Sequence, residues 1–191
     1  MKLPIVAYGD PVLRKKAKDI DKDYPQLDVL IENLFDTMYA AYGVGIAAPQ
    51  VGLPIRLFVI DGEPYEEDDP TMKDFKKVFI NAQIIEEAGE PWSYSEGCLS
   101  IPDIREDISR NEEITIVYLD ENWVEHEETY SGLAARVIQH EYDHIEGILF
   151  TDKLSPLKKA LLKGKLDDIS RGNIDVDYKM KFPRLRKGRR F

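Results

Sequence analysis

The sequence predicts an α+β fold in a single domain, with mostly antiparallel sheets around a central helix that carries an HExxH motif. Two observations support this fold class: strand-like segments gather in mid-chain, and helical periodicity appears on both sides of them. A chain of 191 residues buries a core without disulfides, and no Pro/Gly/Ser-rich linker divides it. We therefore expect one domain over residues 1–191, with a basic tail from about residue 179.

The first long helix is predicted from its apolar spacing. Between residues 27 and 42, apolar side chains recur every three or four positions and would form one continuous face. Asp23 and Gln26 fit the spacing of a capping box at the start of this helix. Gly43 is expected to adopt the left-handed conformation that ends it.

Two more helices are predicted near the C-terminal end. Residues 132–146 return to helical periodicity and stop at Gly147, and residues 155–169 form an amphipathic segment.

β-Branched and aromatic residues predict the strands. The expected strands are residues 55–60, 78–85, 114–119, 124–130 and 174–182. The third and fourth of these are close enough to pair as a hairpin. Residues 61–69 contain six acidic residues and a proline, which indicates a solvated loop.

Charge and cysteine content exclude several classes of protein. The formal net charge is −10, although seven basic residues and no acid follow from Lys179 onward. An acidic body repels phosphate backbones, so we expect no sequence-specific nucleic-acid binding. No apolar stretch is long enough to span a membrane. The lone cysteine, Cys98, cannot form an internal disulfide, and we expect a protein of the reducing cytoplasm.

The segment His140-Glu141-Tyr142-Asp143-His144 is an HExxH motif. On a helix, histidines at positions i and i+4 project from the same face and can bind one metal ion. Glu141 would lie beside the open coordination position. The sequence therefore predicts a metal site at His140 and His144.

Several residues compete to be the third ligand. No glutamate follows Glu146, which excludes the downstream ligand of many metalloproteases, and Phe150 stands where a metzincin has its third histidine. His126 lies in a predicted strand, and Asp152 has no supporting pattern. Cys98 is left, and a thiolate is a strong ligand in a reducing compartment.

Three protein ligands leave a fourth position open, which is the mark of a catalytic metal site. A bound metal lowers the pKa of its water, and Glu141 would accept the proton so that hydroxide attacks a carbonyl carbon. The Gln50 side chain and a backbone N–H beside Cys98 are suited to stabilise the resulting oxyanion. These residues predict metal-assisted amide hydrolysis.

Three motifs together resemble those of the polypeptide deformylases. They are residues 43–50 (GVGIAAPQ, matching GxGxAAxQ), residues 96–100 (EGCLS) and residues 139–144 (QHEYDH), in the order of the family. Taken alone, residues 43–50 resemble a dinucleotide loop, but a predicted helix precedes them and a strand follows, which is the wrong order. The resemblance covers the chain from about Tyr8 to Pro156. It implies one catalytic domain that removes the formyl group from N-terminal formylmethionine of newly made polypeptides, releasing formate.

The resemblance also implies roles for individual residues. Gln50 and the backbone N–H of Leu99 would be the oxyanion donors. The residues expected to border the formyl group and the extended peptide are Val44, Gly45, Gly97 and Arg105, although Arg110 lies close to Arg105 in the sequence. Val137 and Ile138 are expected in the pocket for the methionine side chain, if they are not simply core.

By the same resemblance, the native cofactor is one Fe²⁺ ion, for which Zn²⁺, Ni²⁺ or Co²⁺ can substitute. The expected partners are nascent peptides that begin with N-formylmethionine. The basic tail suggests a transient contact with the ribosome.

Three other readings stay open. The chain could be another HExxH metallopeptidase, which unformylated peptides would reveal. It could be a non-catalytic metal- or peptide-binding module, in which Glu141 has no function. Finally, Cys98 could be a hydrolase nucleophile, and activity would then resist a chelator.

Overall fold

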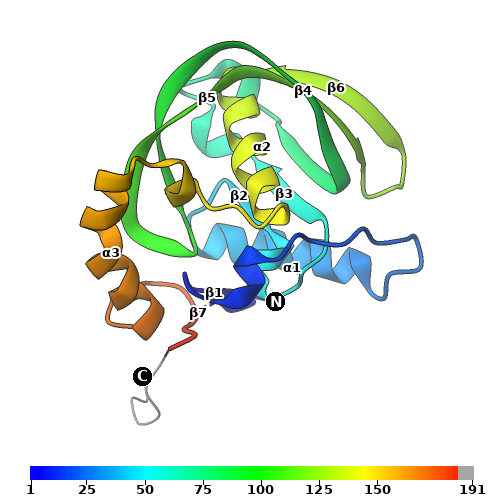
Figure 1. Ribbon diagram of the computed structural model, residues 1–191. Helices are drawn as coiled ribbons and strands as arrows, with labels where there is room; N and C mark the ends of the chain where they lie inside the picture. Colours follow the sequence, from blue (N-terminus) through cyan, green and yellow to red (C-terminus); the bar gives the residue numbers. More distant parts are fainter. Residues whose placement is uncertain (185–191) are drawn as a thin grey trace.

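A computed structural model describes residues 1–184, and their fold is of the predicted α+β class (Figure 1). The strands of the main, antiparallel sheet follow the order β2-β3-β4-β5-β6. Their bounds are β2 (Gly45–Ala47), β3 (Leu57–Asp61), β4 (Lys76–Cys98), β5 (Ile101–Leu119) and β6 (Glu125–Ser131). A second sheet pairs β1 (Ile5–Val6) in parallel with β7 (Met180–Lys181), which lie side by side in Figure 1.

Three α-helices accompany the sheets. They are α1 (Leu27–Ala40), α2 (Gly132–Ile145) and α3 (Pro156–Arg171), and all three lie where the apolar spacing predicts them. Short 3₁₀ helices are η1 (Pro11–Arg14), η2 (Ala48–Val51), η3 (Glu63–Tyr65), η4 (Pro70–Met72) and η5 (Phe150–Lys153). Within residues 1–184, no helix has the length and apolar character needed to cross a membrane.

Both predicted ends of α1 are wrong in detail. Gln26 precedes the helix in a left-handed conformation (φ 54°) and makes no capping bond with its side chain. At the other end, Tyr42 rather than Gly43 is left-handed (φ 56°), and the Gly43 N–H bonds to the Met38 carbonyl. Gly43 instead leaves space for a neighbouring side chain, because a Cβ there would lie 2.8 Å from Leu99 Cδ1 and would displace the end of that side chain.

The β4–β5 hairpin is much longer than the sequence predicts. The prediction ended the first strand at residue 85 and began the second at residue 114, yet pairing continues to Cys98 and Ile101. Residues 86–95 of β4 are mostly exposed. From residue 103 to 110, β5 alternates between exposed and less exposed residues, but the buried positions include Arg110, so the apolar alternation typical of a half-buried strand is missing. The expected hairpin of residues 114–119 and 124–130 is present as the end of β5 paired with β6.

At the C-terminal end, the predicted strand 174–182 is reduced to the two residues of β7. Of the basic tail, Lys179, Lys181 and Arg184 lie in the described part. The other four basic residues, at positions 186, 187, 189 and 190, lie outside the described residues.

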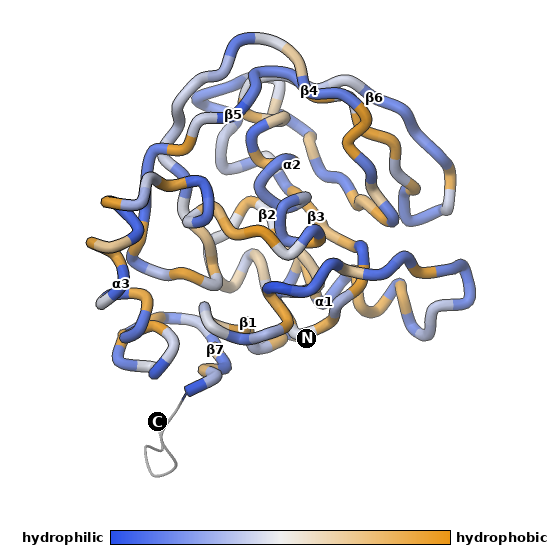
Figure 2. The backbone as a smooth tube through the Cα atoms, viewed as in Figure 1, coloured by the Kyte–Doolittle hydropathy of each residue, from blue (hydrophilic) through white to orange (hydrophobic). Residues whose placement is uncertain are grey.

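Helix α2 is held by the core of the main sheet. Ala135 and Ile138 of α2 are fully buried in one apolar cluster with Phe58, Phe79 and Ile116 of the strands. Figure 2 shows that β6 is mostly hydrophilic along its length. Burial on this scale fixes the rotation of α2, and so decides which of its side chains face the end of the β4–β5 hairpin.

Candidate active site

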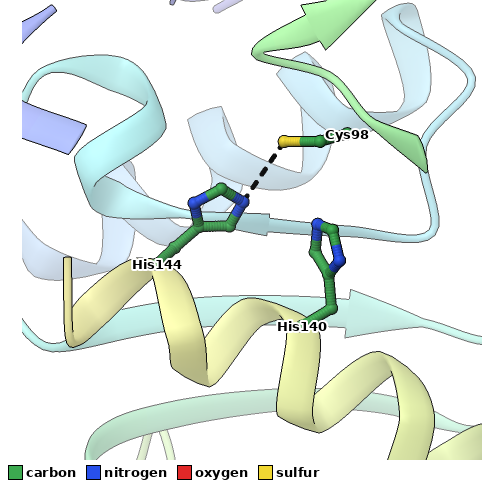
Figure 3. A group of neighbouring side chains, drawn as sticks. All are labelled: Cys98, His140 and His144. Carbon is green, nitrogen blue, oxygen red and sulfur yellow. Dashed lines mark hydrogen bonds between the residues drawn. The ribbon is translucent and has the colours of Figure 1, made fainter. Parts of the chain in front are cut away.

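His140 and His144 project from the same face of α2 toward Cys98 at the end of β4 (Figure 3). The ligand atoms of these three residues lie within 4.8 Å of one another, and Cys98 Sγ is 3.3 Å from His144 Nε2. A thiolate and two imidazoles at these separations can share one tetrahedral metal ion. Among residues 1–184, this is the one such group of three histidine, cysteine or acidic side chains.

The ionisation of the two histidines fits a cation at this place. Burial lowers the pKa of His144 well below its ordinary value, which leaves a neutral ring with a free lone pair. Burial also lowers the pKa of His140, but contacts with Cys98 and Glu96 more than offset this and raise it to about 10. Positive charge is therefore favoured between Cys98 and Glu96, where a divalent metal would replace the proton.

Glu96 orients His140 and is a residue to which the sequence assigned no role. Its carboxylate lies 2.9 Å from His140 Nδ1, which directs Nε2 of the ring toward the metal site. Arg110 donates two hydrogen bonds to the same carboxylate, at 2.6 and 2.9 Å, and Arg136 donates another at 2.9 Å. Burial alone would raise the pKa of Glu96, but the hydrogen bonds and positive charges of Arg110 and His140 lower it and keep the group ionised. The sequence feature that could have identified Glu96 is its position at the start of the EGCLS motif.

Glu141 lies beside the cluster and is only 4% exposed. Burial raises its pKa to about 7, and its Oε2 atom has no hydrogen-bond partner among the described residues. Gly45 makes room for it: a Cβ at residue 45 would lie 2.6 Å from Glu141 Oε1. This carboxylate is thus free to exchange a proton at neutral pH.

The side chain of Gln50 is held by its own backbone neighbourhood. Its Oε1 atom accepts a hydrogen bond of 2.8 Å from the Ala47 N–H, which fixes the orientation of the side-chain amide. The Nε2 atom therefore points to the cluster, 3.5 Å from Cys98 Sγ and 3.4 Å from Ser100 Oγ. Nε2 donates long hydrogen bonds to both atoms, which places this donor beside Cys98.

A cavity of about 490 Å³ opens over these residues. Its lining includes nearly every residue that the sequence singled out: Val44, Gly45, Gln50, Gly97, Cys98, Leu99, Arg105, Val137, His140 and Glu141. Two further residues do not line the cavity: His144 is only 1% exposed although it belongs to the metal cluster, and Ile138 is a core residue.

Arg105 and Arg110, which the sequence could not separate, have different surroundings. Arg105 is exposed at the cavity and donates a hydrogen bond of 2.7 Å to the Ser95 carbonyl. Arg110 is buried between Glu96 and Asp143. Only Arg105 is therefore accessible to a peptide in the cavity.

The sequence missed part of the cavity wall. Three exposed aspartates lie at its mouth, and we call them the acidic rim: Asp103, Asp175 and Asp177. Tyr178 lines the same wall. Asp175, Asp177 and Tyr178 are far from the three motifs in the chain, whereas Asp103 lies three residues after the EGCLS motif. Nothing in the local sequence of these residues distinguishes them from surface loops.

The competing metal ligands lie elsewhere. His126 Nε2 on β6 is 2.9 Å from Asp120, and Asp152 accepts a hydrogen bond of 2.5 Å from Arg14. Neither belongs to the Cys98 cluster. The choice of Cys98 by elimination is therefore consistent with the geometry.

A mixed α+β domain with a Cys-His-His cluster, a buried glutamate and a cavity above them is typical of metal-dependent hydrolases. Residues 2–160 match the polypeptide deformylase family. A peptide deformylase of Christiangramia forsetii is 67% identical, with 99% of this chain and 100% of that protein aligned. One of Flavobacterium johnsoniae is 57% identical over the same shares. This chain belongs to the polypeptide deformylase family.

The fold agrees with solved structures of the family. The crystal structure of a peptide deformylase from Legionella pneumophila superposes with a TM-score of 0.79 at 39% identity, covering 91% of this chain and 98% of that one. The resemblance of the three sequence motifs to this family is thereby confirmed.

Proposed function

We propose that this chain removes the formyl group from N-terminal formylmethionine of newly synthesised polypeptides, by hydrolysis of the formamide to formate and a free amine. The observation that carries this proposal is the placement of Glu141 and Gln50 beside the Cys98 cluster, at the base of a cavity open to a peptide. Family membership supports the reaction.

Cys98, His140 and His144 would hold one divalent ion, which when bound polarises the carbonyl and lowers the pKa of water. Glu141 accepts the proton of the attacking water and returns it to the leaving amine. Its pKa of about 7 suits both transfers near neutral pH. The Gln50 amide and the Leu99 N–H donate hydrogen bonds to the developing oxyanion, and each such donor lowers the barrier by about 3–4 kcal/mol.

The substrate peptide would lie along the cavity wall. Gly45 of β2 and the preceding Val44 would border it on one side, and Gly97 of β4 with Arg105 of β5 on the other. Val137 would contact the methionine side chain. Strand edges suit this task because an extended peptide can pair with their backbone groups.

We propose Fe²⁺ as the native metal. One thiolate and two imidazoles also suit Zn²⁺, Ni²⁺ and Co²⁺, so the metal in a preparation reflects availability as well as affinity. Activity is expected to fall during aerobic handling of iron-loaded protein and to persist in nickel-loaded protein. Equal loss in both preparations would contradict the assignment of iron.

We place the reaction in the cytoplasm, with a transient ribosome contact through the basic tail. Charge attraction to ribosomal RNA supports this contact. The test is co-sedimentation with ribosomes after deletion of residues 184–190. Unchanged co-sedimentation would contradict the contact and leave the catalytic proposal intact.

The catalytic proposal is tested by formate release from formyl-Met-Ala, with anaerobically purified, iron-loaded protein. We expect rapid release, loss of release with a chelator, and a fall of 10²- to 10⁴-fold in Glu141→Gln. Glu127→Gln is the matched control, because Glu127 is an exposed glutamate of β6 and far from the cavity lining.

Three results would overturn parts of this proposal. No release by folded, metal-loaded protein would contradict the reaction. Cleavage of unformylated Met-Ala peptides would favour a peptidase. Release that resists the chelator would favour Cys98 as a nucleophile.

A further inference from the structure

The two-residue turn between β4 and β5 consists of Leu99 and Ser100, and it is held from both ends of the described chain. The Tyr8 N–H donates a hydrogen bond of 2.8 Å to the Ser100 carbonyl. The Tyr178 hydroxyl donates one of 2.7 Å to the Leu99 carbonyl. Both carbonyls of the turn beside the Cys98 ligand are therefore fixed by residues outside the three motifs.

The segment that carries Tyr178 is itself anchored. Met180 and Lys181 pair with β1, and the Ile5 N–H donates to the Lys179 carbonyl at 2.9 Å. The half-buried Tyr178 ring packs against an apolar cluster that Leu99 also joins. Burial raises the pKa of Tyr178, so its hydroxyl stays protonated and remains a donor. Residue 178 is thus placed rigidly, with its polar atom aimed at the turn.

The orientation of the Leu99 N–H depends on this contact. The N–H and the carbonyl of one residue are separated by only two soft dihedral angles, so a fixed carbonyl restricts the N–H. The Leu99 side chain is also confined, because its Cδ1 atom occupies the space a Cβ of Gly43 would need. As a metal ligand, Cys98 would restrain the Cys98–Leu99 peptide, which carries the Leu99 N–H.

We infer that Tyr178 is a positioning residue, whose hydroxyl holds the Leu99–Ser100 turn so that the Leu99 N–H points into the cavity toward the oxyanion. The inference rests on the proposed function, in which this N–H is an oxyanion donor. It assigns a part of the active site to the segment after α3, outside the region of residues 2–160 that matches the family.

The test compares Tyr178→Phe with wild type in the full-length, metal-loaded protein. Removing one oxygen leaves the ring packing intact, and we expect kcat to fall about three- to tenfold, as for the loss of one neutral hydrogen bond. KM should stay within twofold, because the peptide contacts are unchanged. Independently of activity, amide NMR of the zinc-loaded protein should show faster hydrogen exchange at Leu99.

Tyr24→Phe is the matched control, since Tyr24 is also half-buried against the same apolar cluster but does not line the cavity. An equal fall of kcat in both variants would show a merely structural role and overturn the inference. Unchanged kcat and Leu99 exchange in Tyr178→Phe would overturn it as well. Failure of the proposed function can be distinguished from failure of this inference, because in the former case the wild-type protein itself would release no formate.

Discussion

Gly45 is the position at which a single added methyl group should do most damage to activity. A Cβ built on Gly45 would lie 2.6 Å from Glu141 Oε1, 2.8 Å from its Cγ and 2.9 Å from its Cδ. Contacts between carbon atoms are optimal at about 3.5–4.0 Å, so Glu141 must move by roughly 0.5–1 Å in Gly45→Ala. Backbone strain adds nothing, because Gly45 is a paired residue of β2 and its φ is not positive.

The expected cost follows from this displacement. Misplacing a catalytic group by about 1 Å costs on the order of 10²-fold in rate, so kcat for formate release should fall by about that factor. Overpacking should also lower the free energy of unfolding by about 1–3 kcal/mol. Steady-state kinetics and denaturant unfolding measure the two effects separately.

Gly164→Ala is the control for the chemical change itself. Gly164 lies within α3, and an added Cβ there would meet nothing within 4 Å. That variant should keep full activity and gain about 0.5–1 kcal/mol of stability, because alanine favours helix. If folded Gly45→Ala released formate within threefold of the wild-type rate, the contact between Gly45 and Glu141 would not limit catalysis and the reasoning would fail.

Other predictions concern the metal, pH and substrate charge. A bound metal present at about 1,000 times its Kd stabilises a fold by about 4 kcal/mol, so removing it with a chelator should lower the melting temperature. An unchanged melting curve would contradict a metal site at Cys98. Burial raises the pKa of Glu128, but hydrogen bonds from Tyr118, Tyr130 and Lys77 outweigh this and lower it. Since the folded pKa lies below the ordinary value of 4.5, Glu128 stabilises the fold above that pH and the effect is lost as pH falls through the folded pKa. In urea unfolding at pH 7, the free energy of unfolding of Glu128→Gln should therefore be lower than that of the wild type by about 1 kcal/mol, and the difference should be smaller below pH 4.5. The loss is no larger because the Glu128 side chain is 36% exposed to solvent. Because of the acidic rim, formyl-Met peptides with a following lysine should have a several-fold higher kcat/KM than those with a following glutamate. Salt at about 0.5 M should reduce this ratio, and a ratio that salt leaves unchanged would contradict its electrostatic origin.

Periodicity predicted the helices well because their apolar faces are continuous. The ends of α1 were less predictable, because they depend on tertiary contacts. Tyr42 takes the left-handed position that glycine usually occupies, while the adjacent Gly43 lies where the Leu99 side chain packs. A local rule for helix ends cannot anticipate a side chain that arrives from 56 residues away in the chain.

The residues of the site likewise divide into those that the sequence predicts and those that depend on tertiary contacts. Cys98, His140 and Glu141 stand in motifs whose spacing states their chemistry. Glu96 opens the EGCLS motif and Tyr178 lies outside all three motifs, but the role of each depends on a partner brought to it by the fold: His140 for Glu96, and the Leu99 carbonyl for Tyr178. The hairpin that delivers Cys98 was also missed by hydrophobic alternation, since residues 86–95 of β4 have no buried side chain and the buried face of β5 includes the charged Arg110.

The bond between Tyr178 and Leu99 has a consequence for the synthesis of the protein itself. Ribosomes add about 5–20 residues per second, so roughly 2–7 s separate the addition of His144 from that of Tyr178. Throughout this interval the growing chain contains its three metal-binding side chains but lacks both β7 and the hydroxyl that holds the Leu99–Ser100 turn. A protein that processes the beginnings of unfinished chains thus completes its own active site only seconds after its last metal-binding residue has been added.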